Sequence, residues 1–272
     1  MDISYLFYLS SGLFLGWSLG ANDASNIFGT AVGSKMVRFT TIALISSFFV
    51  ILGAVYGGAG ASKTLGSLGA VNALAGAFMV ALSAALAVYS MARTGLSVSS
   101  SQAVVGAIIG WNIYAGKPTD LETLARICST WTICPLLSGI VAVILYMLFK
   151  RMLKYSHLHL LMQDQITRIG LIVTAAISAY ALGANNIANA VGMFVESCPF
   201  KPLKIGNLTT FTPEQVLFFL GSVAVSVGIL TYSKKIIMTV GNNLMKMTPI
   251  SAWIVVLSQA IVLLLFSSIT LH

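Results

Sequence analysis

Long apolar stretches dominate this sequence and limit what it can fold into. Seven of them approach the length of about 20 residues that a helix needs to cross the hydrocarbon core of a membrane. Only 8% of the residues are charged, whereas soluble domains carry about 25%. Lipid must therefore cover much of the surface, and we expect an all-α, polytopic membrane protein. The stretches are residues 3–19, 39–58, 71–91, 124–149, 166–183, 216–232 and 250–269.

Two shorter pieces, residues 21–33 and 97–111, are rich in Gly, Asn and Ser. They are too polar for a lipid-facing helix and too apolar for an ordinary loop. Irregular backbone is tolerated at membrane depth only where protein or a cavity surrounds it. We therefore expect discontinuous helices and a re-entrant hairpin at these pieces.

The net charge of +8 comes from cations that lie between the apolar stretches. In that position cations set membrane topology and contact anionic lipid headgroups. No Lys/Arg run is interleaved with aromatic residues, so we expect membrane lipid and not nucleic acid as a partner. Residues 150–168 hold four Lys or Arg against Asp164 alone, which predicts a cytoplasmic loop over 150–165.

The sequence also repeats itself. Residues 20–26, Gly-Ala-Asn-Asp-Ala-Ser-Asn, return at 183–189 as Gly-Ala-Asn-Asn-Ile-Ala-Asn, an offset of 163. Residues 80–83 return at 255–258, an offset of 175, and the extra loop near 199–210 accounts for the difference. We expect one transmembrane repeat in residues 1–149 and another in 166–272. The residues leave parallel and inverted arrangements open, but transporters often use inverted repeats.

The second repeat looks shorter than the first. By the offset of 175, His272 aligns with Ser97, so a second hairpin and a final span have no counterpart. We expect either that the chain is a truncated piece of a product about 50 to 70 residues longer, judged from the repeat, or that a partner, such as another copy in a homo-oligomer, supplies the missing half-site.

Asp23 is the one carboxylate among seven that lies at the end of an apolar stretch. An ionisable group at membrane depth is expensive to bury, and therefore predicts a functional site. The alternative is a helix cap, because Asn and Asp accept hydrogen bonds from free N–H groups at a helix start. A cap explains one such residue, not three polar positions repeated in both halves.

If a helix starts at each repeated motif, its polar residues lie three and four positions apart and share a face. Two half-helix N-termini would then direct N–H groups and positive dipole ends at a shared point, which suits an anion. Amide oxygens beside a carboxylate suit a hard cation such as Na⁺, and for it we select Asp23, Asn22 and Asn185. The predicted substrate-binding residues of the two motifs are Asn22, Asp23, Asn26, Asn185, Asn186 and Asn189.

A Ser-rich run at residues 97–102 gives a second group of polar side chains. Hydroxyls and an amide at the tip of a hairpin can donate to the oxygens of phosphate or sulfate. The alternative is Ser packing between membrane helices. The predicted anion-binding residues here are Ser99, Ser100, Ser101 and Gln102.

These motifs resemble those of the inorganic phosphate transporter (PiT) family, which includes proton- or sodium-coupled phosphate carriers and related sulfate permeases. The family's signature looks like Gly-Ala-Asn-Asp followed by a small-residue Asn motif, as at 20–26 and, altered, at 183–189. Its hairpin resembles Pro-Val-Ser-Thr-Thr-His-Ala-Ile-Val-Gly-Ala, and residues 97–107 match that pattern. Asn186 stands where an Asp is usual and Gln102 where His is common, so two titratable groups are missing.

The resemblance implies a secondary transporter of inorganic phosphate in the cell (inner) membrane, coupled to Na⁺ or H⁺ and needing no other cofactor. A sulfate permease is the first alternative. Phosphate can donate a hydrogen bond to an acceptor such as Asp23 and sulfate cannot, so Asp23 favours phosphate, but Asn186 in place of a second Asp weakens that preference. A passive anion channel is the second. The sequence shows no Ser-His, Cys-His or HExxH arrangement, so we do not expect an enzyme.

Overall fold

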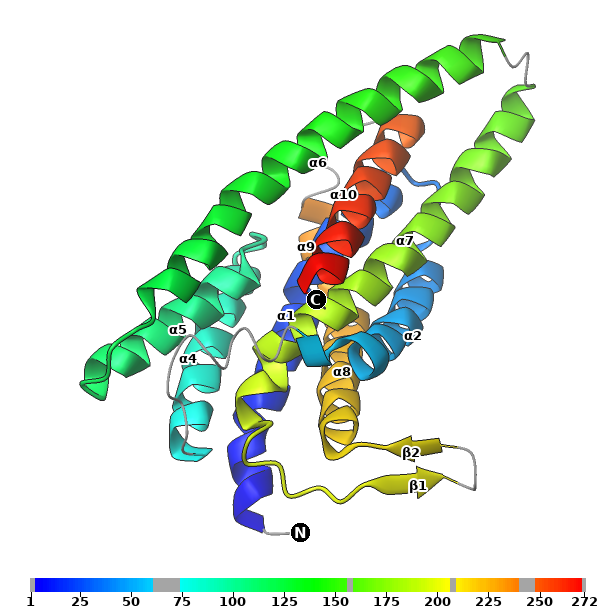
Figure 1. Cartoon of the computed structure of the whole chain (residues 1–272). Coiled ribbons are helices and arrows are strands. Elements are labelled where there is room, and N and C mark those ends of the chain that lie inside the picture. Colours follow the sequence, from blue (N-terminus) through cyan, green and yellow to red (C-terminus); the bar gives the residue numbers. More distant parts are fainter. Residues whose placement is uncertain (1–2, 61–73, 156–158, 206–208, 240–247, 271–272) are drawn as a thin grey trace.

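The computed structural model describes residues 3–60, 74–155, 159–205, 209–239 and 248–270. Helices account for nearly all of the regular structure (Figure 1). They are α1 (Ile3–Gly33), α2 (Phe39–Gly57), α4 (Leu74–Arg93), α5 (Ser100–Tyr114), α6 (Leu121–Tyr155), α7 (Leu160–Val191), the 3₁₀ turn η1 (Gly192–Phe194), α8 (Pro213–Thr231), α9 (Ser233–Thr239) and α10 (Pro249–Thr270).

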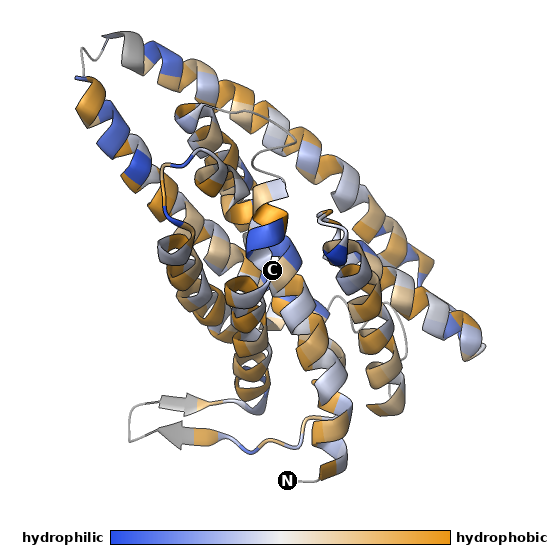
Figure 2. Ribbon diagram, turned by 180° about the vertical axis from the view of Figure 1, so that it is seen from behind, coloured by the Kyte–Doolittle hydropathy of each residue, from blue (hydrophilic) through white to orange (hydrophobic). Residues whose placement is uncertain are grey.

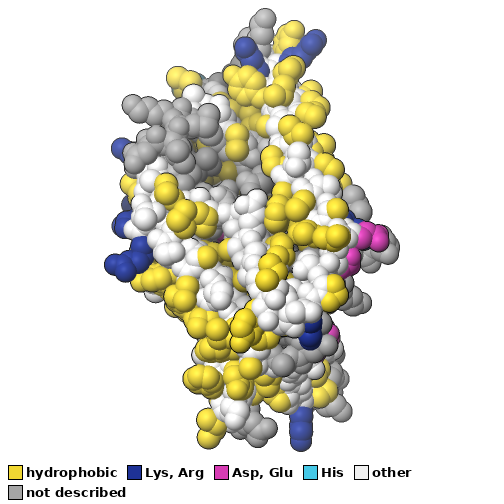
Figure 3. All heavy atoms as spheres, turned by 90° about the vertical axis from the view of Figure 1, so that its left-hand side faces the viewer, with side chains coloured by type: hydrophobic (Ala, Val, Ile, Leu, Met, Phe, Trp, Pro, Cys, Tyr) yellow, Lys and Arg dark blue, Asp and Glu magenta, His cyan; other side chains and the backbone are white. Residues whose placement is uncertain are grey.

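The helices have the character of membrane spans. Within the described residues, α2, α4, α6, α7 and α8 are long and apolar enough to cross a membrane. Hydrophobic residues run along most of their length in Figure 2, and they cover much of the face in Figure 3. The predicted all-helical, polytopic class is therefore confirmed in its main point. The first three residues of the predicted span 71–91 lie outside the described residues.

One small element departs from the all-α prediction. Strand β1 (Leu203–Ile205) pairs antiparallel with β2 (Thr209–Phe211), and Lys204 lies opposite Thr210. The pair extends away from the helices near the start of α8 (Figure 1). It falls in the segment near 199–210 that the repeat offsets mark as an insertion.

Helices from the two halves of the chain cross at closely packed glycines. A Cβ added to Gly20 of α1 would lie 1.9 Å from the Val225 carbonyl oxygen of α8. A Cβ added to Gly183 of α7 would lie 2.1 Å from the Val50 carbonyl oxygen of α2. The repeat offsets relate Gly20 to Gly183 and Val50 to Val225. Positions related by the repeat therefore make equivalent contacts, and α1–α8 and α2–α7 are among the most extensive helix pairs.

The predicted helix breaks at the two motifs are wrong. The first motif lies inside α1, which continues to Gly33, and the second lies inside α7, which continues to Val191. Their polar side chains form hydrogen bonds with other parts of the chain. Because those groups are satisfied from outside the helix, the backbone keeps its own hydrogen bonds through both motifs.

The Ser-rich run does contain a helix start. Residues 97–99 are not helical, and α5 begins at Ser100. Ser99 is its N-cap, with a side-chain oxygen that accepts from the Gln102 backbone N–H at 3.4 Å. The preceding helix α4 packs against α5, so the run 97–101 lies at the turn of a helical pair.

The predicted loop over 150–165 is largely helical, which corrects that prediction. Helix α6 continues to Tyr155 and α7 begins at Leu160, so only a short connection separates them. The ends of these two helices reach beyond the other helices in Figure 1. A helix satisfies its backbone hydrogen bonds internally. It can therefore continue beyond an apolar stretch into a charged one, as α6 and α7 do here.

We predict that this projecting end faces the cytoplasm, because of its excess of cations. A single cysteine at the exposed position Gln165, in a variant that lacks the three native cysteines, should react with a membrane-impermeant reagent only after the membrane is opened. A cysteine at the exposed position Lys201, before the strand pair, serves as the comparison. Labelling of the Gln165 site in intact cells would contradict the predicted orientation.

Candidate functional site

The first motif and the Ser-rich turn are joined directly. The Asn22 side chain donates to the Val98 carbonyl oxygen at 2.7 Å and accepts from the Val98 N–H at 2.9 Å. One turn further along α1, the Ser25 hydroxyl donates to Ser97 Oγ at 3.1 Å, and Ser97 donates to Asn26 Oδ1 at 3.2 Å. The Asn22 amide thus binds both the N–H and the C=O of Val98, as the backbone of a paired β-strand does. These two hydrogen bonds hold the turn against α1.

Asp23 is at the centre of this arrangement and is only 3% exposed. Its Oδ1 accepts from Asn22 Nδ2 at 2.6 Å. Its Oδ2 accepts from the Ser100 hydroxyl at 2.9 Å and from Asn186 Nδ2 at 2.8 Å. All three donors are neutral, and none of the ion pairs in the described part of the chain involves Asp23. The carboxylate is therefore solvated by hydrogen bonds but has no countercharge among these residues.

The second motif reaches the same place from α7. Asn186 meets Asp23, and Asn189 donates to Ser101 Oγ at 3.1 Å. Three segments of the chain, α1, α7 and the turn at 97–99 with the first residues of α5, therefore converge. The convergence of both motifs on the Ser-rich run agrees with the pattern of residues that the sequence singles out.

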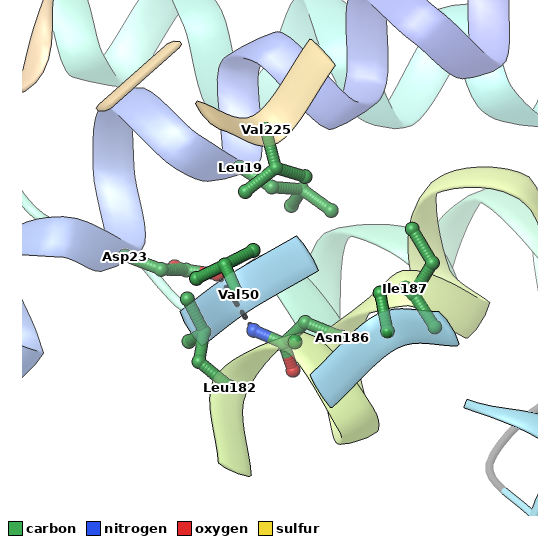
Figure 4. Close-up of a pocket in the computed structure, with 9 residues that line it drawn as sticks. Leu19, Asp23, Val50, Leu182, Asn186, Ile187 and Val225 are labelled. Atoms are coloured by element: carbon green, nitrogen blue, oxygen red, sulfur yellow. Dashed lines mark hydrogen bonds between the residues drawn. The ribbon is translucent and has the colours of Figure 1, made fainter. Parts of the chain in front are cut away.

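A small cavity opens between Asp23 and Asn186 (Figure 4). The space available to the centre of a water-sized sphere is about 10 Å³, which is close to the minimum for a single water molecule. Most of its walls are apolar. The lining residues are Leu19, Asp23, Val50, Ala54, Leu182, Gly183, Asn186, Ile187 and Val225.

The cavity lies where the two repeats meet. The repeat offset of 163 relates Leu19 to Leu182 and Asp23 to Asn186, and the offset of 175 relates Val50 to Val225. All six line the cavity. In Figure 4 Asp23 and Asn186 approach from opposite walls, joined by their hydrogen bond. Of these three pairs, only Asp23 and Asn186 differ in residue type, and they differ in charge.

Some predicted residues lie at the edge of this arrangement. Gln102 and Asn26 are exposed, although Asn26 is linked to the turn through Ser97. Asn185 donates to the carbonyl oxygen of Ala181 in its own helix at 2.9 Å. In the second motif the amide that contacts Asp23 is that of Asn186, not that of Asn185. The predicted cation-binding set of Asp23, Asn22 and Asn185 stays a prediction.

Sequence reasoning missed the apolar walls of the cavity and the role of the turn's backbone. Val50, Leu182 and Val225 look like ordinary apolar residues of a span, and Val98 offers only its peptide groups. Aligning the halves by both offsets would have paired Val50 with Val225. Nothing in the residue types signals that Val98 meets Asn22.

Known proteins that this chain resembles are named as phosphate or sulfate transporters or permeases. A profile described as the phosphate transporter family matches residues 19–271. A protein of Methanocaldococcus jannaschii, named provisionally as a phosphate permease, is 23% identical over 99% of this chain and 80% of its own. The sulfate permease CysP of Bacillus subtilis is 30% identical over 85% of this chain and 62% of its own.

A solved structure has the same fold. It is that of a sodium-dependent phosphate transporter and superimposes with a TM-score of 0.79, covering 99% of this chain and 85% of that one, at 21% identity. Two Helicobacter pylori relatives at 24–25% identity are matched over 64% of their length, so this chain spans a little under two thirds of those proteins.

Proposed function

Because this chain belongs to the phosphate transporter family, we propose that it carries inorganic phosphate across the cell membrane as a secondary transporter coupled to Na⁺ or H⁺. The observation that carries the proposal is the buried Asp23, which has three neutral donors and no countercharge among the described residues. A buried carboxylate of this kind is costly without a cation. The solved protein with the same fold is, by its name, sodium-dependent.

The anion would bind away from the small cavity beside Asp23. That cavity has room for about one water-sized particle and its walls are apolar, so it is too small for a tetrahedral oxyanion. The Ser-rich turn and the N-terminus of α5 are connected to Asp23 by a different contact. Ser100, the first residue of α5, donates its hydroxyl to Asp23 Oδ2. Helix N-termini and hydroxyls are favourable for phosphate oxygens.

The architecture we propose is a pair of inverted repeats with a re-entrant hairpin over residues 97–111, which holds the turn at 97–99 and most of α5. Equivalent glycine crossings at Gly20 and Gly183 support the repeat. The cavity between equivalent residues supports a site at the repeat interface, where transporters of this kind bind their substrates. The short helix α5, which contacts α1 and α7 near the motifs, supports a hairpin that ends at the site.

A sulfate permease is a second candidate, and one observation favours it. Both oxygens of Asp23 already accept hydrogen bonds, which leaves the carboxylate less able to accept a proton from phosphate. A site made mainly of donors would accept sulfate equally well. The CysP relative, a sulfate permease by name, fits this second candidate.

Competition in proteoliposomes tests the choice of anion. Purified protein should take up radiolabelled phosphate, and unlabelled phosphate should compete at least ten times more effectively than sulfate. The reverse order would assign the chain as a sulfate permease. Uptake of neither anion, by protein shown to be folded and inserted, would contradict the proposed function.

The Ser-rich turn should bind the anion. We predict that changing Ser99, Ser100 and Ser101 together to Ala lowers the apparent affinity for the anion by about 10- to 100-fold, because up to three hydrogen bonds of about 0.5–1.5 kcal/mol each are lost. Initial uptake rates over a range of anion concentrations give the affinity.

Ser90→Ala is the matched control for this variant. Ser90 is exposed, and its hydroxyl donates only to the Ala87 carbonyl oxygen within α4. Its affinity should equal that of the unchanged protein. Unchanged affinity in the triple variant as well would mean that these hydroxyls do not bind the anion.

A further inference from the structure

We propose that Lys235 is a positioning residue for the Ser-rich turn. From α9 it holds the end of α4, and it thereby keeps the hydroxyls of the turn in the arrangement that binds the anion. The proposal rests on the proposed function, because it takes this turn as the anion site. Lys235 belongs to neither repeated motif and is separated from Arg93, the residue that it contacts, by 142 positions in the sequence.

The contact lies where α4 ends and the turn begins. Lys235 Nζ donates to the carbonyl oxygen of Arg93 at 2.7 Å, and Arg93 is the last residue of α4. The last carbonyl groups of a helix lack partners within it and carry the negative end of its dipole, so a cation is favourable there. Gly95 follows with a φ of +83°, a conformation that favours glycine and turns the chain out of the helix.

Helix α9 also approaches the turn at a second point and is itself anchored on α1. A Cβ added to Gly95 would lie 3.2 Å from Thr239 Oγ1, so α9 and the turn pass close to each other. Ile237 is buried in the same apolar cluster as the α1 residues that follow Asp23. Lys235 is on the exposed side of α9. The base of the contact is therefore fixed on the helix that carries Asp23.

The turn is thus held from two sides. On the α1 side, Asn22 binds the backbone of Val98 and Asn26 accepts from Ser97. On the α9 side, Lys235 holds the end of α4. A turn that loses one attachment spends part of its time in arrangements where its hydroxyls do not converge. The apparent affinity then falls in proportion to the fraction of competent protein, whereas a saturating concentration of anion holds the turn itself and preserves the maximal rate.

Initial rates of anion uptake separate these two effects. Lys235→Met keeps the apolar stem and removes the charge and the donor. It should raise the apparent KM for the anion about three- to fivefold, which is the effect of losing a cation at a helix C-terminus, with an unchanged maximal rate. Lys235→Arg keeps a charged donor and should restore the KM. Lys234→Met is the matched control, because it removes the same charge from the neighbouring exposed residue of α9; its KM should stay unchanged.

Hydrogen–deuterium exchange of the peptide 94–101 in the purified full chain reports the turn directly and needs no transported anion. We expect faster exchange in Lys235→Met than in the unchanged protein, Lys235→Arg or Lys234→Met. Size-exclusion profile and thermal unfolding are compared first, so that a general loss of folding is recognised.

Equal exchange in Lys235→Met and the unchanged protein would overturn the proposal, as would faster exchange with an unchanged KM. An equal rise of KM in Lys234→Met would assign the effect to net charge and would overturn it too. If Lys235→Met does not fold, exchange of this peptide in the unchanged protein as fast as in an unfolded chain would still contradict a held turn. Faster exchange in Lys235→Met alone, in a protein that moves neither phosphate nor sulfate, would remove the proposed function and leave the hold of Lys235 on the turn established.

Discussion

Replacing Asp23 by Asn should reduce gradient-driven anion uptake at least 100-fold while the protein still inserts in the membrane. Asn keeps the size of the side chain and removes the charge. It also places an NH₂ group where Oδ1 or Oδ2 now accepts from Asn22, Ser100 and Asn186, so at least one donor loses its acceptor. Loss of a buried charge partner typically costs about 3–5 kcal/mol, which is more than 100-fold in a binding constant.

Initial uptake rates in proteoliposomes, normalised to the amount of reconstituted protein, measure this effect. Asp120→Asn is the control, since Asp120 precedes α6 and bonds locally to Thr123; it should transport normally. Undiminished uptake by the Asp23 variant, with the same dependence on Na⁺ or H⁺, would remove Asp23 from the mechanism.

Valine at Gly20 or Gly183 should prevent the helices from assembling. Even the first carbon of a side chain would lie 1.9 Å from the Val225 carbonyl oxygen, or 2.1 Å from that of Val50, and real atoms do not approach so closely. Backbone atoms cannot turn aside as a flexible side chain can. Relief therefore requires that α1 separate from α8, or α7 from α2, which would also open the cavity.

We expect both variants to lose most of the monodisperse peak in size-exclusion chromatography, with a large drop in the melting temperature of any protein that remains. Gly106→Ala and Gly110→Ala are the controls. Nothing lies within 4 Å of a Cβ at either position of α5, and Ala is favoured over Gly in a helix by about 1 kcal/mol. A Gly20→Val variant as stable as the unchanged protein would mean that the helices do not cross here.

The positions of the spans could be predicted closely because hydropathy reports lipid contact directly. The stretch 39–58 corresponds to α2 (Phe39–Gly57), and 216–232 corresponds to α8 (Pro213–Thr231). The motifs were harder to interpret. Gly, Asn and Ser in a row favour a break when only local preferences count, but in α1 and α7 their side chains are satisfied by distant partners.

The polar part of the candidate site could also be predicted, because a carboxylate and repeated amides are conspicuous among apolar residues. The sequence selects Asp23, Ser100 and Asn186, and the structure brings these three together. It does not reveal which amide of the second motif meets Asp23, since neighbouring positions on a helix differ only by rotation. The apolar cavity walls are equally hidden, because they depend on how α2 and α8 cross the other two helices.

Accumulation of phosphate against its own gradient tests the central claim most directly. Proteoliposomes that contain the purified protein are given equal phosphate on both sides, and an inward gradient of Na⁺ or of protons is then imposed. Coupled transport predicts that internal phosphate rises above the external concentration and that the rise disappears when the cation gradient is removed or when Asp23 is replaced by Asn. Exchange of labelled phosphate at an equal rate with and without either gradient, and without accumulation, would contradict coupled transport and identify a passive anion channel.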